Sequence, residues 1–422
     1  MSPRGARLAD RRFVSYLAAR FAAAAAVMML RAAIAWQVFA ISRSAFHLGL
    51  IGLVQFVPAL GLTLLGGAVA DAYDRRRVAL AAEVVPLVCS ILLWEETARG
   101  TAGLGLLYAT VFVVSVASAF ENPAAVALLP ALVRRDSFPR AVAVATTSRA
   151  LGFATGPAAC GLVIAGAGIA AAYAAVFALV GVALAATSRV IVDSREMPRR
   201  PLDLRAIREG LAFVRGHPVV LGCMTLDMFA VVFGGAAALL PVYATDILHV
   251  GPRGYGLLAS SLDIGAILCS ILLTVLPPIR RAGPVLLVTV ALYGAATVVF
   301  GLSRSFPLSV AAYMAVGVFD QVSVVLRSTT IQLATPDELR GRVSAVSLVF
   351  IGASNQLGAA ESGFLAALTS ATFSVVAGGA ASLVVVAAVA LVFPELRRHR
   401  LELRGVPRPG RARSSRESAP DR

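Results

Sequence analysis

The chain has 422 residues, of which 58% are hydrophobic and only 14% are charged. Ordinary soluble domains carry about 25% charged residues, so this composition excludes a soluble globular protein and indicates an integral membrane protein. The formal net charge is +15, and all 38 basic residues are arginine.

Twelve apolar segments are long enough to cross a bilayer as helices, which takes about 20 mostly apolar residues each. In chain order they span 13–41, 47–70, 77–94, 102–126, 141–165, 168–190, 218–245, 255–277, 284–303, 306–333, 341–368 and 372–393. No short apolar leader with a cleavage site precedes the first span, so we expect no removable signal peptide. The predicted fold is an all-α integral membrane protein with twelve transmembrane helices.

Polar stretches divide this series into parts. We expect a cytoplasmic basic arm (1–12), a six-helix bundle (13–190), a cytoplasmic linker (191–217), a second six-helix bundle (218–394) and a basic disordered tail (395–422). Within the linker, Leu204, Ile207, Leu211 and Val214 recur at helical spacing. This pattern predicts an amphipathic helix on the inner membrane surface.

The arginines gather on one side of the predicted membrane. Thirty lie in segments that share a side with both termini, against four on the other side: Arg43, Arg99, Arg253 and Arg304. Positively charged loops stay inside, so we expect both termini in the cytoplasm. This distribution explains the net charge without nucleic acid, and the basic loops can contact anionic lipid headgroups.

The two halves of the chain repeat one another at a constant offset of 204 residues. The matching positions are Gln37-Val38-Phe39-Ala40 with Pro241-Val242-Tyr243-Ala244, Gly52 with Gly256, Gly61 with Gly265, and Arg76-Arg77 with Arg280-Arg281. This internal repeat predicts that the fold consists of two six-helix parallel pseudo-repeats. Parallel repeats of this kind place a transporter's binding site near the midplane between the halves.

The segment after the second span reads Gly66-Gly67-Ala68-Val69-Ala70-Asp71-Ala72-Tyr73-Asp74-Arg75-Arg76-Arg77. It resembles the G-x-x-x-D-x-x-G-R-R signature of the major facilitator superfamily, although Asp74 stands where many members have glycine. The resemblance implies a latch in which Asp71 and an arginine hold the halves together on the cytoplasmic side. The gating residues would be Gly67, Asp71, Asp74, Arg75, Arg76, Arg340 and Arg342. The alternative is a basic loop that only determines topology.

The fifth span contains Gly152, Gly156, Pro157 and Gly161. Their spacing resembles the G-x-x-x-G-P-x-x-G-G antiporter signature of drug:proton exporters, with Cys160 in place of one glycine. The resemblance favours export over import. The alternative is ordinary close packing of a membrane helix, which also selects small residues.

Two further segments refine the family. Pro336-Asp337-Glu338-Leu339-Arg340-Gly341-Arg342-Val343 and Leu128-Leu129-Pro130-Ala131-Leu132-Val133 resemble loops of the enterobactin-exporter-like branch of the superfamily. The resemblance extends over about residues 13–394. It implies the major facilitator fold and a transporter, and it says little about the substrate.

Ionisable residues inside membrane spans are costly and usually functional. A buried carboxylate that binds and releases a proton can couple transport to a gradient, and the candidates are Asp320 first, then Asp227 and Asp263. Residues expected at the substrate cavity are Arg31, Arg327, Asn355, Gln356, Glu361 and Trp36. Arg31 would hold an anionic substrate or tune a carboxylate across the cavity.

A structural role is the alternative for each of these residues. The first half carries five ionisable residues within its spans: Arg20, Arg31, Glu83, Glu121 and Arg149. We expect Glu121 to pair with Arg149 near the cytoplasmic ends of two successive spans. In the second half, Asp320 and Arg327 lie seven residues apart and share one helix face.

These observations favour a proton-coupled exporter of a small amphipathic molecule, such as a siderophore, an antibiotic or another metabolite. It would work by alternating access, as a monomer, in the bacterial cytoplasmic (inner) membrane. An importer or facilitator, and a non-transporting scaffold or sensor, are the alternatives. We expect no enzyme activity, because no nucleophile–His–acid cluster is present. The scattered cysteines and histidines lack metal-ligand spacing, so we expect neither a metal nor a cofactor.

Overall fold

The computed structural model describes residues 10–190, 204–277 and 279–400, and within them it leaves undescribed the side chains of Thr63, Leu64, Asp71 and 204–207. Every regular element in these ranges is helical. The elements are α1 (Arg11–Ser42), α2 (Ala45–Ala72), α3 (Arg75–Ala98), α4 (Leu104–Leu132), η1 (Arg135–Ser137), α5 (Phe138–Ser188), α6 (Leu204–Gly216), α7 (Pro218–Phe233), η3 (Ala236–Leu239), α8 (Leu240–Val242), η4 (Tyr243–Ile247), α9 (Gly251–Val275), α10 (Ala282–Leu302), α11 (Phe306–Ala334), α12 (Arg340–Leu368), α13 (Ala371–Val392) and α14 (Pro394–Arg398).

Eleven helical stretches of the described residues are long and apolar enough to cross a membrane. One of them contains two predicted spans, because α5 turns at Gly168, where φ is 84° and ψ is 173°. Glycine adopts this backbone conformation without strain since it has no Cβ. The two arms of α5 correspond to the predicted spans 141–165 and 168–190. The twelve-span all-α architecture is therefore confirmed.

The predicted span 218–245 is not one continuous helix. α7 ends at Phe233, and the chain continues through η3, α8 and η4 to Ile247. The break falls at Gly234 and Gly235, where a Cβ on Gly235 would lie 2.6 Å from the carbonyl carbon of Gly358 in α12. Hydropathy does not register this break, because the residues around it are apolar.

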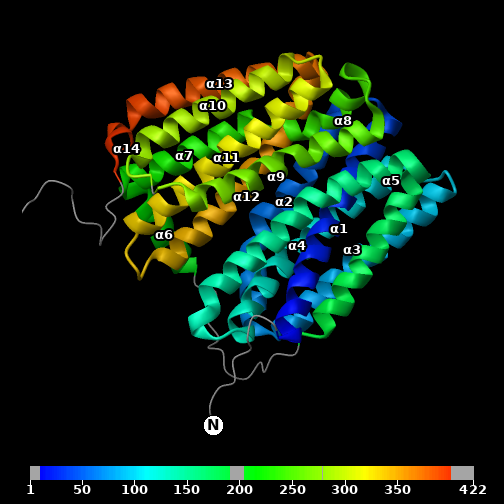
Figure 1. Ribbon diagram of the computed structural model, residues 1–422, viewed down its shortest axis with the longest axis horizontal. Helices are drawn as coiled ribbons and strands as arrows, with labels where there is room; N and C mark the ends of the chain where they lie inside the picture. The colour runs from blue at the N-terminus through cyan, green and yellow to red at the C-terminus, as the bar shows by residue number, and fades with distance from the viewer. Residues whose placement is uncertain (1–9, 191–203, 278, 401–422) are drawn as a thin grey trace, which may run out of the picture.

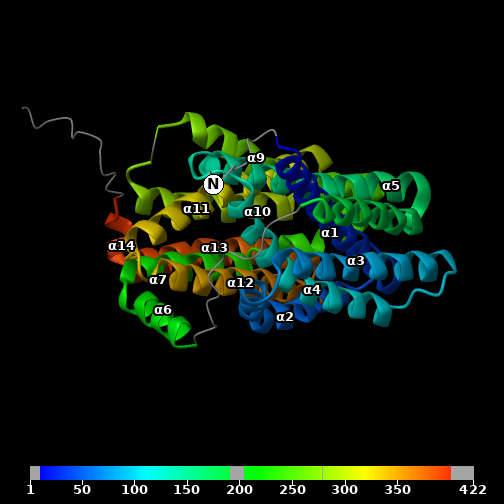
Figure 2. The ribbon, with the colours of Figure 1, turned by 90° about the horizontal axis from the view of Figure 1, so that it is seen from below.

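The helices form two groups, which we call the N-half (α1–α5) and the C-half (α7–α14). Figure 1 shows the N-half at the lower right and most of the C-half at the upper left, with α9 and α12 near the junction. Figure 2 shows the molecule from below, with α6 and α14 at the end far from α3 and α5.

Repeated glycines join the halves. A Cβ on Gly52 of α2 would lie 2.8 Å from the Cβ of Ala359 in α12, and a Cβ on Gly256 of α9 would lie 2.9 Å from the Cα of Gly161 in α5. Gly52 and Gly256 are counterparts in the 204-residue repeat. Each half therefore packs its second span against the fifth span of the other, as a duplicated unit with two-fold symmetry would do.

The junction continues into an aromatic contact between α1 and α9. The hydroxyl of Tyr255 donates to the carbonyl oxygen of Ala32 at 3.1 Å. The ring of Trp36 packs on Tyr255 with the centroids 5.2 Å apart. Buried residues of both halves form one hydrophobic cluster here.

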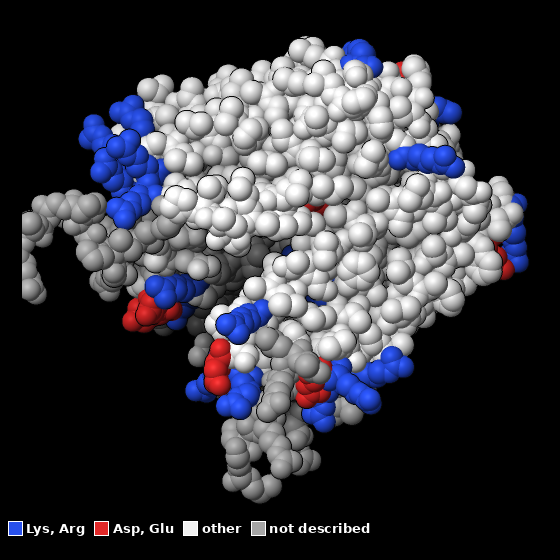
Figure 3. All heavy atoms as spheres, viewed as in Figure 1, with Lys and Arg blue, Asp and Glu red and all other residues white. Residues whose placement is uncertain are grey.

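The halves separate at the end of the molecule that carries the arginine-rich loops. Figure 3 shows a hollow between them at the lower left, with blue arginine atoms visible inside it. α6 and the start of α1 lie on that side in Figure 1. The structure thus represents a conformation that is open toward the side predicted to be cytoplasmic.

α6 overlaps the predicted amphipathic helix of the linker and packs on the C-half. Val214 is only 3% exposed and joins the core of that half, with Leu211 packed against it. Glu209 forms an ion pair with Arg342 of α12. The apolar stripe therefore contacts protein at these two positions instead of lying on lipid alone.

The predicted disordered tail begins with structure. Residues 394–398 form α14, in which Leu396 is 1% exposed. The amide of Gly283 donates to the carbonyl of His399 at 3.2 Å, which fastens this segment to α10. One apolar residue among arginines is enough to anchor the segment, and the prediction was wrong here. The rest of the tail, from 401 onward, lies outside the described residues.

Candidate functional site

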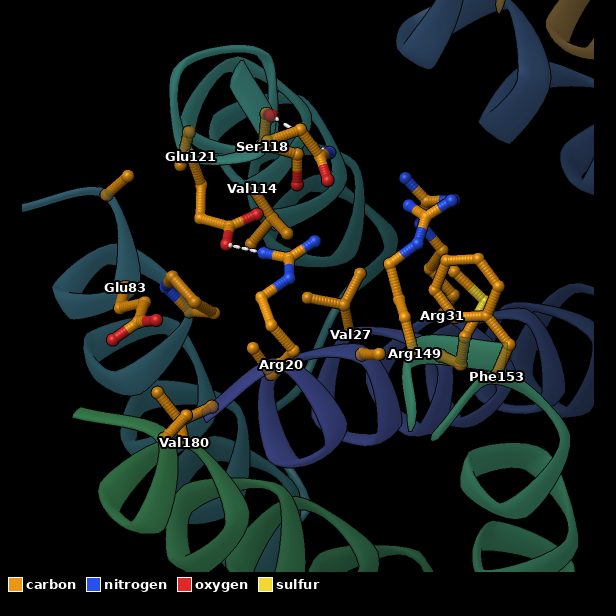
Figure 4. A pocket seen from close by; sticks show the side chains of 18 residues that line it. Arg20, Val27, Arg31, Glu83, Val114, Ser118, Glu121, Arg149, Phe153 and Val180 are labelled. Carbon is orange, nitrogen blue, oxygen red and sulfur yellow. Dashed lines mark hydrogen bonds and ion pairs between the residues drawn. The ribbon is translucent and has the colours of Figure 1, made fainter. Parts of the chain in front are cut away.

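A cavity of about 720 Å³, a volume that includes its opening to solvent, lies inside the N-half. All of its described lining residues come from α1, α3, α4 and α5. Figure 4 shows apolar side chains such as Val27, Val114 and Phe153 next to charged ones. The charged lining residues are Arg20, Arg31, Glu83, Glu121 and Arg149.

Close packing of α1 against α5 places three of these arginines. A Cβ on Gly152 would lie 2.6 Å from the carbonyl oxygen of Phe21, and one on Gly156 would lie 2.6 Å from that of Ala25. Small residues let the two backbones approach this closely. Long side chains near the contact have no room between the helices and extend into the cavity.

Arg20 and Glu121 form an ion pair across the cavity wall, with Nη1 and Oε1 2.5 Å apart. Their side chains are 7% and 16% exposed, so water screens the pair weakly. The predicted pairing of Glu121 with Arg149 is wrong, because α1 packs against both α4 and α5 and brings Arg20 to Glu121. The guanidinium of Arg149 lies over the ring of Phe153 instead, 4.8 Å from its centroid.

Glu83 is a buried carboxylate without a cation. It is 5% exposed, and its Oε1 accepts a hydrogen bond from Thr187 Oγ1 at 2.9 Å. Its Oε2 has no hydrogen-bond partner, and Glu83 makes no ion pair within the described residues. An ionised carboxylate in this position is costly unless a proton or another partner joins it.

Arg31 and Arg149 are cations without a carboxylate partner in the part of the chain that the structure describes. Both line the cavity, and Figure 4 shows their side chains extending on the far side of Val27 from the Arg20–Glu121 pair. The cavity wall carries three guanidinium groups and two carboxylates. It keeps one excess positive charge even when both carboxylates are ionised.

In the C-half, Arg327 forms an ion pair with Asp227 of α7. Arg327 is 4% exposed and the side chain of Asp227 is 11% exposed. Arg327 was predicted to line the substrate cavity together with Asp320. Its side chain is instead buried in this ion pair. Asp227 neutralises a buried cation, which makes it a weaker candidate for binding and releasing a proton.

Asp320 lies in a small second cavity, together with Asp227, Tyr293 and Ser323. Within the described residues it makes no hydrogen bond or ion pair. Asp263 of α9 is near enough to interact with it electrostatically. The structure therefore brings the three proton-coupling candidates into one region of the C-half, apart from the cavity that contains Arg31.

The other predicted cavity residues lie elsewhere. Trp36 packs at the junction on Tyr255, and Asn355 is exposed on α12. Gln356 is half-buried in the same helix, and Glu361 accepts a 3.3 Å hydrogen bond from its neighbour Ser362. None of these four is among the described residues that line either cavity. Their contact with substrate stays a prediction.

The predicted gating loop contains a helix cap. Asp74 accepts hydrogen bonds from the amides of Arg76 at 2.9 Å and Arg77 at 3.1 Å, which caps α3. This explains the departure from glycine, because aspartate is a favoured N-cap residue. Arg75 donates to the carbonyl of Ala127 at 3.0 Å and so links the loop to α4.

None of the described contacts of the remaining gating arginines joins the N-half to the C-half. Arg76 donates to the carbonyl of Ser188 at the end of α5. Arg340 pairs with Asp337 at 2.7 Å, and Arg342 pairs with Glu209. A Cβ on Gly67 would meet no atom within 4 Å, and the side chain of Asp71 lies outside the described residues. These contacts agree with an opening at the arginine-rich end.

The antiporter-like motif lies where α5 contacts two other helices. Gly152 and Gly156 pack on α1, whereas Gly161 packs on Gly256 of α9 in the other half. The carbonyl oxygen of Pro157 also faces α9, 2.7 Å from where a Cβ on Gly256 would lie. Every position of the motif therefore sits at a helix contact.

All four cysteines are buried and unpaired. The described residues contain no group of three or more His, Cys, Asp or Glu side chains that could hold a metal ion. The sequence pattern identified the five N-half charges as intramembrane residues but ranked the C-half carboxylates above them. Spacing along one helix does not reveal that four different helices point charges into one space.

A family model described as transmembrane secretion effector matches residues 4–404. The chain is 26% identical to the enterobactin exporter EntS of Escherichia coli O139:H28 (strain E24377A / ETEC), over 92% of this chain and 93% of that protein. The enterobactin exporter EntS of Escherichia fergusonii gives the same identity and coverage.

Solved structures show the same fold at low identity. A POT family transporter in complex with 5-aminolevulinic acid has a TM-score of 0.73 at 12% identity, covering 91% of this chain and 96% of that one. A bacterial homologue of the human lysosomal transporter Spinster, in an inward-facing and unoccupied conformation, has a TM-score of 0.67 at 13% identity, covering 92% and 97%.

Proposed function

The chain belongs to the transmembrane secretion effector family of the major facilitator superfamily, and on that premise we propose that it is a proton-coupled exporter of a small amphipathic molecule. The chain is a multi-pass membrane transporter, and its relatives are transporters, not enzymes. What is proposed is the direction, the coupling ion and the class of cargo.

The observation that carries the proposal is the N-half cavity with its buried, incompletely paired charges, in a molecule that is open at its arginine-rich end. An exporter must collect its cargo from the cytoplasm in such a state. The 26% identity to enterobactin exporters supports an outward direction and a siderophore-like, antibiotic-like or other metabolite cargo. The arginine distribution supports a cytoplasmic membrane location with both termini inside.

Two carboxylates are the first candidates for proton coupling, and Asp263 of α9, which interacts electrostatically with Asp320, comes after them. Asp320 has no cation partner in the small C-half cavity. Glu83, in the large cavity, forms no ion pair within the described residues, and its Oε2 has no hydrogen-bond partner. Protonation would neutralise either group and so remove the cost of carrying a charge through the closed intermediate between the two open states. Asp227 is a poorer candidate because Arg327 already neutralises it.

The test is resistance to aromatic antibiotics and efflux of enterobactin in an exporter-deficient bacterium expressing the chain. We expect the chain to confer export, and Asp320→Asn or Glu83→Gln to abolish it while membrane protein levels stay normal. The control is Glu95→Gln, which alters an exposed carboxylate at the opposite end of the molecule. Uptake of the same compounds would contradict export, and full activity of both variants would contradict proton coupling through these two groups.

A further inference from the structure

We propose that Arg31 and Arg149 form a binding site for the anionic group of an amphipathic aromatic substrate in the N-half cavity. The inference rests on the proposed transport function and specifies the charge of the cargo. The site is formed within one half of the molecule, whereas the cavity residues expected from the sequence are spread over both halves.

The charges in the cavity wall are not balanced. Arg20 is neutralised by Glu121 at 2.5 Å, but Arg31 and Arg149 have no carboxylate partner among the described residues. An unpaired cation in a membrane span is costly and is retained where it has a function. The second carboxylate of the cavity, Glu83, is engaged with Thr187 and pairs with neither arginine. A negative charge on the cargo would supply what the cavity lacks.

The guanidinium groups of Arg31 and Arg149 can both donate hydrogen bonds to a bound anion. Arg31 is partly exposed although it lies in the interior span α1, and its nitrogen atoms are not among the buried polar atoms that lack partners. Its N–H groups therefore face the open space of the cavity. The central guanidinium carbon of Arg149 lies 4.8 Å from the centroid of the Phe153 ring, and no hydrogen bond or ion pair occupies its N–H groups within the described residues. A guanidinium edge is suited to a planar carboxylate.

The cavity wall next to the two arginines is apolar. Phe153, Met28 and Val27 line the same cavity as the two arginines. An aromatic ring can pack against these side chains while its acidic group binds the guanidinium groups. A purely inorganic anion would leave this apolar surface uncovered, so the geometry favours an aromatic acid.

The experiment is isothermal titration calorimetry of the purified, detergent-solubilised full chain with 2-naphthoate and with its neutral analogue 2-naphthamide. We expect 2-naphthoate to bind at least roughly tenfold more tightly, because a hydrogen bond to a charged group carries that preference. Arg31→Gln and Arg149→Gln should each remove the preference for the acid. Arg31→Lys, which keeps the charge but not the planar edge, should retain part of it.

Arg253→Gln is the matched control, because Arg253 is exposed at the opposite end of the molecule. Equal affinity for the two compounds, no binding of either, or a preference that survives in both glutamine variants would overturn the proposal. So would a loss that is equally large in Arg253→Gln. Size-exclusion profiles verify that each variant is folded. If Arg31→Gln is misfolded, the titrations of Arg149→Gln and Arg31→Lys test the proposal in its place.

This measurement uses no gradient and no cell. If the charge preference is found but the chain exports nothing, the binding site stands and the proposed direction of transport fails. If export is found without a charge preference, the proposed direction of transport stands and the proposed binding site fails.

Discussion

At the scale of single residues, burial and pairing separate charges that look alike in the sequence. Asp227 and Asp320 are both carboxylates within predicted spans of the C-half. Asp227 forms an ion pair with the buried Arg327, whereas Asp320 has no cation among the described residues. The first therefore has a structural role that the second lacks, and the two should respond differently to substitution.

The prediction for the pair concerns stability. Asp227→Ala leaves the guanidinium of Arg327 buried and uncompensated, which should cost about 3 kcal/mol or more. The double variant Asp227→Leu with Arg327→Met replaces the pair by apolar side chains and should recover most of the loss. Thermal unfolding of the detergent-solubilised protein measures both. A single variant as stable as the parent would show that the ion pair is not formed.

At the scale of helices, small residues decide which spans touch. Hydropathy located the spans within a few residues, yet it did not indicate the Gly234–Gly235 break or that α1 contacts both α4 and α5. Both depend on how closely backbones approach across the bundle. The antiporter-like motif acts at this scale, since Gly161 and Gly256 form a backbone contact between the halves.

The prediction for this contact compares two substitutions in one helix. Gly161→Val inserts a side chain into the α5–α9 contact and should lower thermal stability, since overpacking costs about 1–3 kcal/mol, and should reduce transport. Gly166→Val is the control, because a Cβ there meets nothing within 4 Å. Equal behaviour of the two variants in unfolding and efflux assays would mean that the contact does not support this conformation.

At the scale of the whole molecule, the halves meet at one end and part at the other. The α2–α12 and α5–α9 contacts join them, while the arginine-rich end is open, and there Arg76 bonds to the end of α5 and Arg342 pairs with Glu209 of α6. Alternating access requires the joined end to open in turn. Holding that end shut should therefore stop the transport cycle.

A disulfide tests this requirement. A Cβ on Gly52 would lie 2.8 Å from the Cβ of Ala359, closer than the about 3.5–4.5 Å of a disulfide, so the cross-link forms with a small outward shift of the two helices. Oxidised Gly52→Cys with Ala359→Cys should lose transport, and reduction should restore it. The single variants Gly52→Cys and Ala359→Cys are the controls, and their transport should be the same with and without oxidant, which separates the effect of the cross-link from that of crowding at Gly52. Undiminished transport by the cross-linked protein would rule out opening at the α2–α12 contact.

The sequence by itself determined the membrane character, the twelve spans, the clustering of arginines in one set of loops, the internal duplication and the family. Each follows from a local quantity: the transfer free energy of about 20 residues, the cost of moving charged loops, or a repeated pattern. Only the tertiary structure decided that Arg20 pairs with Glu121, that Asp227 is neutralised, and that unpaired arginines share one cavity. Such pairings depend on which helices become neighbours and how they are rotated, and helix order along the chain does not specify either.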